Sequence, residues 1–344
     1  MKIIIDAMGG DHAPDAVVQG ALQAAKEFKV VIVLVGRGAE LLASMKSHGF
    51  ETLPEGVEIA NAEDMVDMHD DPTQVIQQHR GSSMVVGLKM LADGGGDAFI
   101  SAGNTGALLT ASTLMVKRIR GIRRAAFAPM MPTEQGHAVL IDAGANSECS
   151  PEFLMQFGCM GSFYAQKALG MERPRVGLLN NGTEEGKGDA LRKEAYLLLK
   201  KADEKGLLHF VGNIEARDVP LGAADVIVAD GFSGNVLLKS MEGTAIFMSH
   251  MMKDMFKGFF PKLGALFCKK SINRIRKTMD YRETGGSVVI GISKPVIKAH
   301  GSSDALAIRS AIRQAMNAVN SGFCDEIRAN IAQMTLLREV DNAE

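Results

Sequence analysis

Short runs of β-branched and aliphatic residues recur along the chain, and each is followed by a polar, glycine-containing loop and a longer amphipathic stretch. The runs are apolar on both faces, which is typical of strands in a parallel sheet that helices cover on both sides. This alternation predicts an α/β fold with a doubly wound, largely parallel sheet. We predict strands at residues 3–5, 30–35, 57–59, 98–100, 138–141, 176–179, 226–228 and 288–290, and helices at residues 13–28, 80–92, 107–118, 151–169, 189–205, 236–257 and 303–321.

The chain is long enough for a large hydrophobic core. Its 344 residues exceed the usual domain length of roughly 100–200 residues, and 46% of them are hydrophobic. No linker or internal repeat divides the chain, because glycine-rich stretches such as residues 94–96 are too short to separate domains. We therefore predict one large α/β domain over residues 1–335, with a protruding amphipathic basic hairpin at about 245–280 and a tail at 336–344.

Charge, cysteine content and hydropathy exclude several classes of protein. The 38 Lys and Arg nearly balance the 40 Asp and Glu, so the net charge of −2 gives no indication of a nucleic-acid partner. The four cysteines lie far apart without a CxxC pair, which favours reduced thiols over disulfides or a zinc site. The longest aliphatic run has six residues, at 30–35, and the apolar start of the chain is too short for a signal peptide. We expect a cytoplasmic protein that is soluble or at most peripherally membrane-associated.

Six polar loops combine glycine with Ser, Thr, Asn or Asp, and five of them directly follow a predicted strand and lead towards a helix. In open α/β sheets, ligands bind beyond the carboxyl ends of strands, where such loops meet. Helix N-termini, glycines that permit close approach, and hydroxyl or amide donors together favour an oxyanion such as phosphate. Any single loop is explained as well by turn and capping residues, but six similar loops favour the binding interpretation. The loops span residues 6–11, 101–106, 142–146, 180–188, 230–235 and 300–304.

Motifs for common cofactors and nucleophiles are absent from the sequence. The loop around Lys187 lacks the glycine at Asn181 and the hydroxyl residue at Gly188 that the motif GxxxxGK(S/T) needs, and no GxGxxG motif occurs. Residues 231–234 do not form the GxSxG of a nucleophilic serine, and the histidines include no HExxH zinc motif. We therefore expect no cofactor and no metal. One chemistry consistent with these absences is acyl transfer from a thioester to bound phosphate, which is then itself the nucleophile.

Five motifs occur in an order that resembles the PlsX family of bacterial phosphate acyltransferases over roughly residues 1–320: DAMGGDHAP, SAGNTGALL, LLNNGTEEGKG, ADGFSGNV and KAHGSSD. The resemblance implies transfer of a fatty acyl group from acyl carrier protein to inorganic phosphate, without a covalent enzyme intermediate. The acyl phosphate would begin phosphatidic acid and phospholipid synthesis and would be consumed by a membrane glycerol-3-phosphate acyltransferase. The resemblance also implies a homodimer whose fold is similar to that of isocitrate dehydrogenases and phosphotransacetylases.

The same resemblance assigns a functional cleft to the polar loops. We expect Lys187 to neutralise phosphate or the developing oxyanion, and Asn235 to donate to the thioester carbonyl. His300 is expected to protonate the departing thiolate, although a structural histidine explains it equally well. The expected phosphate- and substrate-binding residues are Gly103, Asn104, Thr105, Asn180, Gly182, Thr183, Asp230, Ser233, Ser302 and Ser303, with Asn104, Thr105, Ser302 and Ser303 on the phosphate oxygens.

Three acidic residues of these loops, Asp6, Asp11 and Asp230, do not attract an anion directly. They are expected to fix loops by accepting backbone N–H bonds, or to orient Lys187. Asn181 departs from the family pattern, in which many members carry a small apolar residue at this position. The departure affects the packing of its loop more than the chemistry.

Apolar residues recur at three- and four-residue steps over residues 248–267, and residues 250–277 carry eight Lys or Arg against one acid. A basic amphipathic helix of this kind suits an anionic membrane surface, and its charge also suits docking of the acidic acyl carrier protein. A core or dimer-interface hairpin with solvated lysines is the remaining alternative, while the family resemblance favours peripheral membrane contact. The predicted membrane or carrier-protein contacts are Lys257, Phe259, Phe260, Leu263, Leu266, Phe267, Lys269 and Lys270.

Other functions stay open at this point. A metal-dependent dehydrogenase or a coenzyme A phosphotransacetylase would use the same architecture. A dehydrogenase would need clustered aspartates, whereas Asp225 and Asp230 stand five residues apart around a predicted strand. A non-enzymatic protein that binds phosphoproteins or membranes would use the loops only as anion pockets. Release of thiol from an acyl donor in the presence of phosphate separates these functions.

Overall fold

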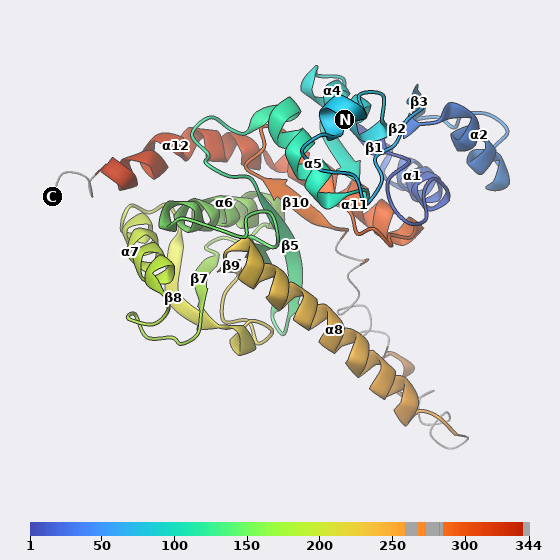
Figure 1. Cartoon of the computed structure of the whole chain (residues 1–344). Coiled ribbons are helices and arrows are strands. Elements are labelled where there is room, and N and C mark those ends of the chain that lie inside the picture. The colour runs from blue at the N-terminus through green and yellow to red at the C-terminus, as the bar shows by residue number, and fades with distance from the viewer. Residues whose placement is uncertain (259–266, 271, 273–281, 283–284, 340–344) are drawn as a thin grey trace.

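Eleven strands form one sheet in the computed structural model, which describes residues 1–258, 267–270, 272, 282 and 285–339 (Figure 1). Their order across the sheet is β3 (Val57–Asn61), β2 (Val31–Gly36), β1 (Lys2–Asp6), β4 (Ala98–Ser101), β11 (Val296–Lys298), β10 (Ser287–Ile290), β5 (Ala126–Thr133), β6 (Gly136–Ile141), β9 (Val226–Val228), β7 (Arg175–Asn180) and β8 (His209–Glu215).

The two halves of this sheet run in opposite directions. Strands β3, β2, β1, β4 and β11 are mutually parallel, and so are β6, β9, β7 and β8. Between them, β10 is antiparallel to both β11 and β5, and β5 is antiparallel to β6. The carboxyl ends of the strands in the first half therefore point to one edge of the sheet, and those in the second half point to the other edge.

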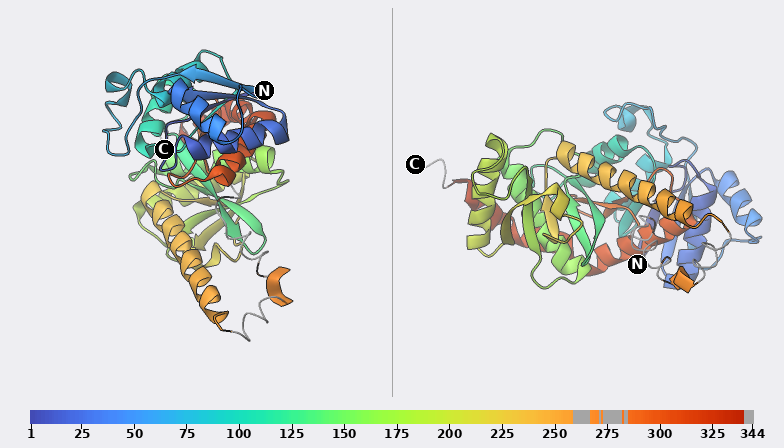
Figure 2. Two further views of the ribbon diagram at one scale, coloured as in Figure 1. Left: turned by 90° about the vertical axis from the view of Figure 1, so that its right-hand side faces the viewer. Right: turned by 90° about the horizontal axis from the view of Figure 1, so that it is seen from below.

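Helices cover both faces of the sheet (Figures 1 and 2). One face packs against a single core cluster that takes residues from α1 (Asp15–Phe28), α2 (Gly38–Ser47), α6 (Pro151–Leu169), α7 (Ala190–Glu204), α11 (Ala305–Ser321) and α12 (Phe323–Glu339). The opposite face carries α3 (Val75–Gln78), α4 (Ser83–Ala92) and α5 (Thr105–Ala111) over the first half, and the start of α8 (Gly231–Met255) over the second.

Side chains along the strands alternate between these layers. Ile3 and Ile5 join the core cluster on one face and Ile4 joins the cluster on the other, because successive strand side chains point to opposite faces. In the second half, Ile141 and Leu140 likewise belong to core clusters on opposite faces of the sheet. Both faces are therefore apolar. This arrangement confirms the predicted α/β fold, a largely parallel sheet with helices on both sides.

All eight predicted strands occur within two residues of their predicted ends, and three further strands are absent from the prediction. β5 contains two prolines, Pro129 and Pro132, which argue against a strand in a sequence reading. β8 contains Gly212 and polar residues, and β11 has only three residues. The missed β5 lies where the sheet reverses direction, so the reversal is not visible in the sequence.

The seven predicted helices also occur, whereas α2, α3 and α12 are absent from the prediction. The predicted helix at 236–257 begins earlier, at Gly231, because the Asp230 side chain caps it by accepting from the Ser233 N–H. The predicted helix at 107–118 consists of α5 and a π-helical segment, η1 (Ser112–Lys117). A short 3₁₀ turn, η2 (Ala216–Asp218), follows β8. α12 continues into the predicted tail.

Helix α8 extends away from the body of the molecule (Figures 1 and 2). Within the described ranges, no helix is long and apolar enough to cross a membrane. Of the predicted hairpin contacts, Lys257, Phe267, Lys269 and Lys270 are exposed, whereas Phe259, Phe260, Leu263 and Leu266 lie outside the described residues. The large apolar side chains exposed along α8 are Phe232, Val236, Ile246, Phe247, Met248, Met251 and Met255.

Gly234 lies where the first turn of α8 crosses the loop after β6. A Cβ atom at this position would stand 1.9 Å from the carbonyl oxygen of Asp142. Because the obstacle is backbone, we predict that Gly234→Ala lowers the free energy of unfolding by at least about 2 kcal/mol, measured by urea denaturation.

The matched control is Gly243→Ala in the same helix. A Cβ atom there meets no atom within 4 Å, so this substitution should raise the free energy of unfolding by about 0.5–1 kcal/mol. Equal effects of the two substitutions would contradict the steric explanation.

Candidate active site

Asp6, at the carboxyl end of β1, is buried and binds three segments together. Its carboxylate accepts from Ser83 Oγ at 2.5 Å, from Ser101 Oγ at 2.7 Å and from the Met8 N–H at 3.2 Å. Burial raises the pKa of Asp6, and these hydrogen bonds oppose the shift. Asp6 thus fixes the first polar loop to the end of β4 and the start of α4, through two serine hydroxyls as well as the expected kind of backbone N–H bond.

Three of the six polar loops pack on one another around Asp6, and we call them the first loop group: residues 6–11, 101–106 and 300–304. The Asp11 N–H donates to the Gly301 carbonyl at 2.8 Å. A Cβ atom at Gly9 would lie 2.8 Å from the backbone nitrogen of Gly103. This close approach requires glycine at residue 9.

Lys298, at the end of β11, is a buried cation that the sequence analysis missed. Its Nζ donates to the carbonyl oxygens of Ala102, at 3.3 Å, and Ala299. Burial lowers the pKa of Lys298 to about 8, and the charges of Asp6 and Asp11 oppose this shift. A lone lysine in the apolar strand sequence VIK is the signal that identifies it.

His300 and the two serines after it occupy the turn between β11 and α11. The His300 Nδ1 lies 2.8 Å from Ser302 Oγ, and partial burial together with Lys239 lowers the pKa of His300. The hydroxyl of Ser303 is buried and has no hydrogen-bond partner among the described residues. It lies next to Asp304, which caps α11 by accepting from the Ala307 N–H. An unpartnered hydroxyl thus stands beside a helix N-terminus.

Both polar atoms of the Asn104 side chain make hydrogen bonds within the protein. Its Oδ1 caps α5 at the Ala107 N–H, at 3.0 Å. Its Nδ2 donates to three carbonyl oxygens of the loop at residues 67–70, at 3.1–3.2 Å. The expected contact of this side chain with phosphate stays a prediction, and a ligand would compete with these hydrogen bonds. Gly103 is buried, and Thr105 is exposed in the first turn of α5.

The other three polar loops, residues 142–146, 180–188 and 230–235, form the second loop group. The buried Asp142 accepts from the backbone N–H groups of Phe127, Ala145 and Asn146, at 3.0, 3.1 and 2.6 Å. Burial raises the pKa of Asp142, against these hydrogen bonds. The Asn146 carbonyl in turn accepts from the Gly231 N–H at 2.7 Å. Asp142 therefore holds the loop on which α8 begins.

Asp230 pairs with Arg192 and not with Lys187, which corrects one of the expected roles of this aspartate. The Arg192 guanidinium donates to the Asp230 carboxylate and, at 2.9 Å, to Ser233 Oγ. Burial raises the pKa of Asp230, but its bonds with Ser233 and Arg192 outweigh this effect, and the net shift is downward. Arg192 lies on the amphipathic α7, where a charged residue is ordinary and gives no sequence signal.

Lys187 is half-exposed on the loop after β7. Its Nζ lies 3.8 Å from Glu184, a weak ion pair. The loop beneath it is shaped by Asn180, whose amide donates to the Lys187 carbonyl at 3.2 Å. Gly182 is buried, and a Cβ atom there would lie 3.0 Å from the Lys187 Cγ; Thr183 is exposed.

Asn235 has a free side-chain amide. It is exposed near the start of α8, above Gly144, and it makes no hydrogen bond to any residue that the structure describes. Its donors are therefore available to a ligand at the second loop group.

Helix α8 connects the two loop groups. Its first residue, Gly231, belongs to the second group, whereas Lys239 and Glu242 lie close enough to His300 to change the pKa of that histidine. Lys239 also lowers the pKa of Lys298. The expectation that the six similar loops meet in one place is wrong: they form two groups of three, because the strands that carry them run in opposite directions.

The two aspartates around β9 do not form a pair. Asp225, before the strand, accepts from the guanidinium and backbone N–H of Arg175 at 2.8–3.1 Å, whereas Asp230 follows the strand. Among the described residues, no group of three or more His, Cys, Asp and Glu side chains could hold a metal ion.

Replacing Arg192 would leave the Asp230 carboxylate, which is 8% exposed, without its cation. We predict that Arg192→Gln lowers the free energy of unfolding by about 3 kcal/mol at pH 7, measured by urea denaturation. The difference from the wild type should shrink as the pH falls below 3.8, because the depressed pKa of Asp230 contributes stability only while the group is ionised.

Arg217→Gln is the control for this prediction. Arg217 is 78% exposed and pairs with Glu215 at 2.7 Å, so its loss should change the free energy of unfolding by less than about 1 kcal/mol. A similar loss in both variants would argue against a special role of the buried pair.

Comparison with known proteins identifies the relatives of the chain. It matches the family model described as "Fatty acid synthesis protein" over residues 1–326. It is 46% identical over 333 residues to the phosphate acyltransferase of Caldanaerobacter subterraneus subsp. tengcongensis, covering 96% of this chain and 97% of the relative. It is 45% identical over 336 residues to the phosphate acyltransferase of Thermoanaerobacter pseudethanolicus, covering 97% and 98%.

A solved structure of similar fold is the phosphotransacetylase from Streptococcus pyogenes. The TM-score is 0.60 at 17% sequence identity, with 93% of this chain and 94% of that chain covered. This likeness confirms the phosphotransacetylase-like fold that the sequence predicts.

Proposed function

Because the chain belongs to the fatty acid synthesis protein family, we propose that it transfers a fatty acyl group from acyl carrier protein to inorganic phosphate. Membership of this family makes the chain an acyltransferase and confirms the resemblance to the PlsX phosphate acyltransferases. The acyl donor and the nucleophilic role of phosphate are our inference from the two loop groups.

The first loop group supports a phosphate site. Lys298 supplies a positive charge in a buried position, where water screens it least. The buried Ser303 hydroxyl has no partner in the described part of the chain, and it stands at the N-terminus of α11. Backbone N–H groups and the helix dipole favour an anion at such a terminus. The presence in one loop group of a buried lysine and a buried hydroxyl without a partner among the described residues is the observation that carries the proposal.

The remaining ligands of phosphate come from the exposed side of the same group. We assign the phosphate oxygens to Thr105, Ser302 and Ser303, together with the backbone at Gly103. Asn104 supports this site indirectly, because its side chain holds the start of α5 and the loop at residues 67–70.

The second loop group suits the thioester. Phosphate attacks the carbonyl carbon, a carbon–oxygen bond forms, and the carbon–sulfur bond breaks as the thiolate leaves. Asn235 and Lys187 stabilise the negative charge that develops on the carbonyl oxygen. His300 can give the departing thiolate a proton from its protonated form, which its lowered pKa makes the minor form near pH 7.

A covalent acyl-enzyme is not needed for this reaction. Cys149 is the thiol beside the second loop group, and burial raises its pKa to about 12. A thiol with such a pKa is almost entirely protonated near pH 7 and is a poor nucleophile. Direct attack by phosphate is therefore the simpler mechanism.

We further propose a cytoplasmic homodimer that associates peripherally with anionic membranes. The exposed apolar side chains along α8 and the exposed Lys257, Phe267, Lys269 and Lys270 support the membrane contact. A membrane glycerol-3-phosphate acyltransferase would then receive the acyl phosphate where it is formed.

The test measures the free thiol that forms on the carrier protein when its acyl thioester is cleaved. We predict release only when inorganic phosphate is present, and a turnover at least tenfold lower in Lys187→Ala, equivalent to about 1.4 kcal/mol of barrier. Thiol formed equally without phosphate would indicate hydrolysis and would refute phosphate as the nucleophile.

Lys193→Ala is the control, because Lys193 is an exposed lysine on the nearby α7. It should keep turnover within about twofold of the wild type. Near-normal turnover of Lys187→Ala at saturating phosphate and donor would remove Lys187 from the catalytic residues.

The pKa of Lys298, about 8, predicts how anion binding depends on pH. Sulfate, whose charge is constant over this range, should inhibit as a competitor of phosphate. Its inhibition constant should be flat below pH 8 and rise about tenfold per pH unit above it, as Lys298 loses its proton. Lys298→Gln should bind sulfate at least tenfold more weakly at pH 7, without a break near pH 8.

Stability provides an independent readout of the same titration. Between pH 8 and 10.5 the unfolded state binds more protons at Lys298 than the folded state, so the contribution of this group to the free energy of unfolding rises with pH. The stability of the wild type relative to Lys298→Gln should therefore rise over this range. A sulfate profile that is identical in wild type and variant would refute the assignment of Lys298 to the anion site.

A further inference from the structure

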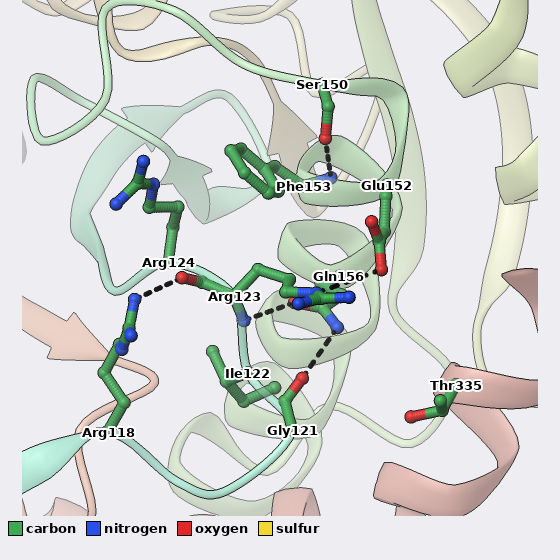
Figure 3. A pocket seen from close by; sticks show the side chains of 10 residues that line it. All are labelled: Arg118, Gly121, Ile122, Arg123, Arg124, Ser150, Glu152, Phe153, Gln156 and Thr335. Atoms are coloured by element: carbon green, nitrogen blue, oxygen red, sulfur yellow. Dashed lines mark hydrogen bonds and ion pairs between the residues drawn. The ribbon is translucent and has the colours of Figure 1, made fainter.

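A hollow of about 750 Å³ lies between the loop that precedes β5, the N-terminus of α6, and α12, and Figure 3 shows its lining. We call it the arginine hollow. Its volume lies in the range of small-molecule sites, roughly 300–1,000 Å³, but its lining is charged where such sites are usually apolar. The lining residues are Arg118, Gly121, Ile122, Arg123, Arg124, Ser150, Glu152, Phe153, Gln156 and Thr335.

The arginine hollow carries an excess of positive charge. Residues 117–124 read KRIRGIRR, with five basic residues and no acid. Three of these arginines line the hollow together with one acid, Glu152, so the lining has a net charge of +2. The Arg123 Nε lies 3.4 Å from the Glu152 carboxylate, whereas Arg118 and Arg124 have no acidic partner among the described residues.

These two arginines keep donors for a ligand. Arg118 donates to the Arg123 carbonyl. Arg124 stacks on Phe153, with its Cζ 5.5 Å from the ring centroid, and it makes no hydrogen bond to the residues that the structure describes. A guanidinium has five N–H donors in a fixed plane, a geometry that fits two oxygens of a phosphate at once.

The loop that presents the arginines is held in place by α6. The Gln156 side chain accepts from the Arg123 N–H at 3.0 Å and donates to the Gly121 carbonyl at 3.2 Å (Figure 3). Ser150 caps α6 at the Phe153 N–H. Because the backbone is fixed before any ligand arrives, less ordering entropy is lost on binding.

The arginine hollow adjoins the second loop group. The Asn146 amide donates to the Ala125 carbonyl at 2.8 Å, directly beside Arg124. Cys149 lies close to both sites. The Gly231 N–H of the second loop group and Arg124 of the hollow both lower the pKa of its thiol, whereas burial and Asp142 raise it. One short loop thus separates the hollow from the start of α8, where the thioester is proposed to bind.

We propose that the arginine hollow binds the phosphate at the end of the donor's pantetheine arm, a group that holo acyl carrier protein and coenzyme A share. The inference rests on the proposed function and extends it, because it places the non-reacting end of the thioester donor. A guanidinium recognises phosphate through charge-assisted, two-pronged hydrogen bonds, and two arginines of the lining are without an acidic partner among the described residues. Binding of this remote group would hold the thioester at the second loop group.

The experiment compares three probes by titration calorimetry: coenzyme A, holo acyl carrier protein, and apo acyl carrier protein, which lacks the arm. The proteins are the wild type, the double variant Arg118→Gln/Arg124→Gln, and Arg120→Gln. Arg120 belongs to the same basic segment but does not line the hollow, so Arg120→Gln controls for general charge effects. Thermal unfolding checks that each variant is folded.

We expect the double variant to lose at least tenfold in affinity for the arm-bearing probes, with the KM for phosphate unchanged. Apo carrier protein should bind all three proteins within about twofold, and Arg120→Gln should behave as the wild type. If the double variant loses affinity for only one of the two arm-bearing probes, coenzyme A or holo carrier protein, that probe identifies the donor that uses the site.

Three outcomes would overturn the inference. They are unchanged affinity of the double variant for both arm-bearing probes, failure of both to bind the wild type, and equal losses for apo and holo carrier protein. The last would assign the hollow to the acidic protein surface. Wild-type turnover is measured separately, so arginine-dependent binding without thiol release would refute the proposed function and keep the phosphate site.

Discussion

Two buried carboxylates hold the strand ends on which both loop groups are built. Asp6 gathers the hydroxyls of Ser83 and Ser101, and Asp142 gathers backbone N–H groups that include that of Asn146. Each donor would lose a hydrogen bond to water on burial, and the carboxylate replaces it. The loops are therefore positioned by interactions inside the protein, so the proposed anion meets a site that is already formed. Preorganisation of this kind lowers the free energy needed to order a site on binding.

The sequence alone is sufficient to predict the features that depend on residues close together in the chain. Apolar runs mark the strands, and glycine with polar residues marks the loops, because both patterns are local. The order and direction of the strands depend on distant pairing, and β5 was hidden because Pro129 and Pro132 lower its strand signal. The division of the loops into two groups follows from that reversal, so it could not be read from the motifs.

The roles of some single side chains can likewise be predicted from the sequence, whereas the roles of others cannot. Asn104 follows a strand and precedes a helix, and in the sequence a capping asparagine looks the same as a ligand-binding one. Lys298 gives a visible signal, a lysine in an apolar strand, whereas Arg192 gives none on its amphipathic helix. Its partner Asp230 lies 38 residues away, a separation that only the fold reveals.

The 25 residues of α8 make a rod of about 37 Å, because an α-helix rises about 1.5 Å per residue. Its first turn is locked against the Asp142 carbonyl by Gly234, and Lys239 stands about a third of the way along. A tilt of about 5° at the locked end would displace Lys239 by about 1 Å and the far end by about 3 Å. A change in the angle of α8 at its first turn would therefore move Lys239 relative to His300, while Gly231 stays at the second loop group.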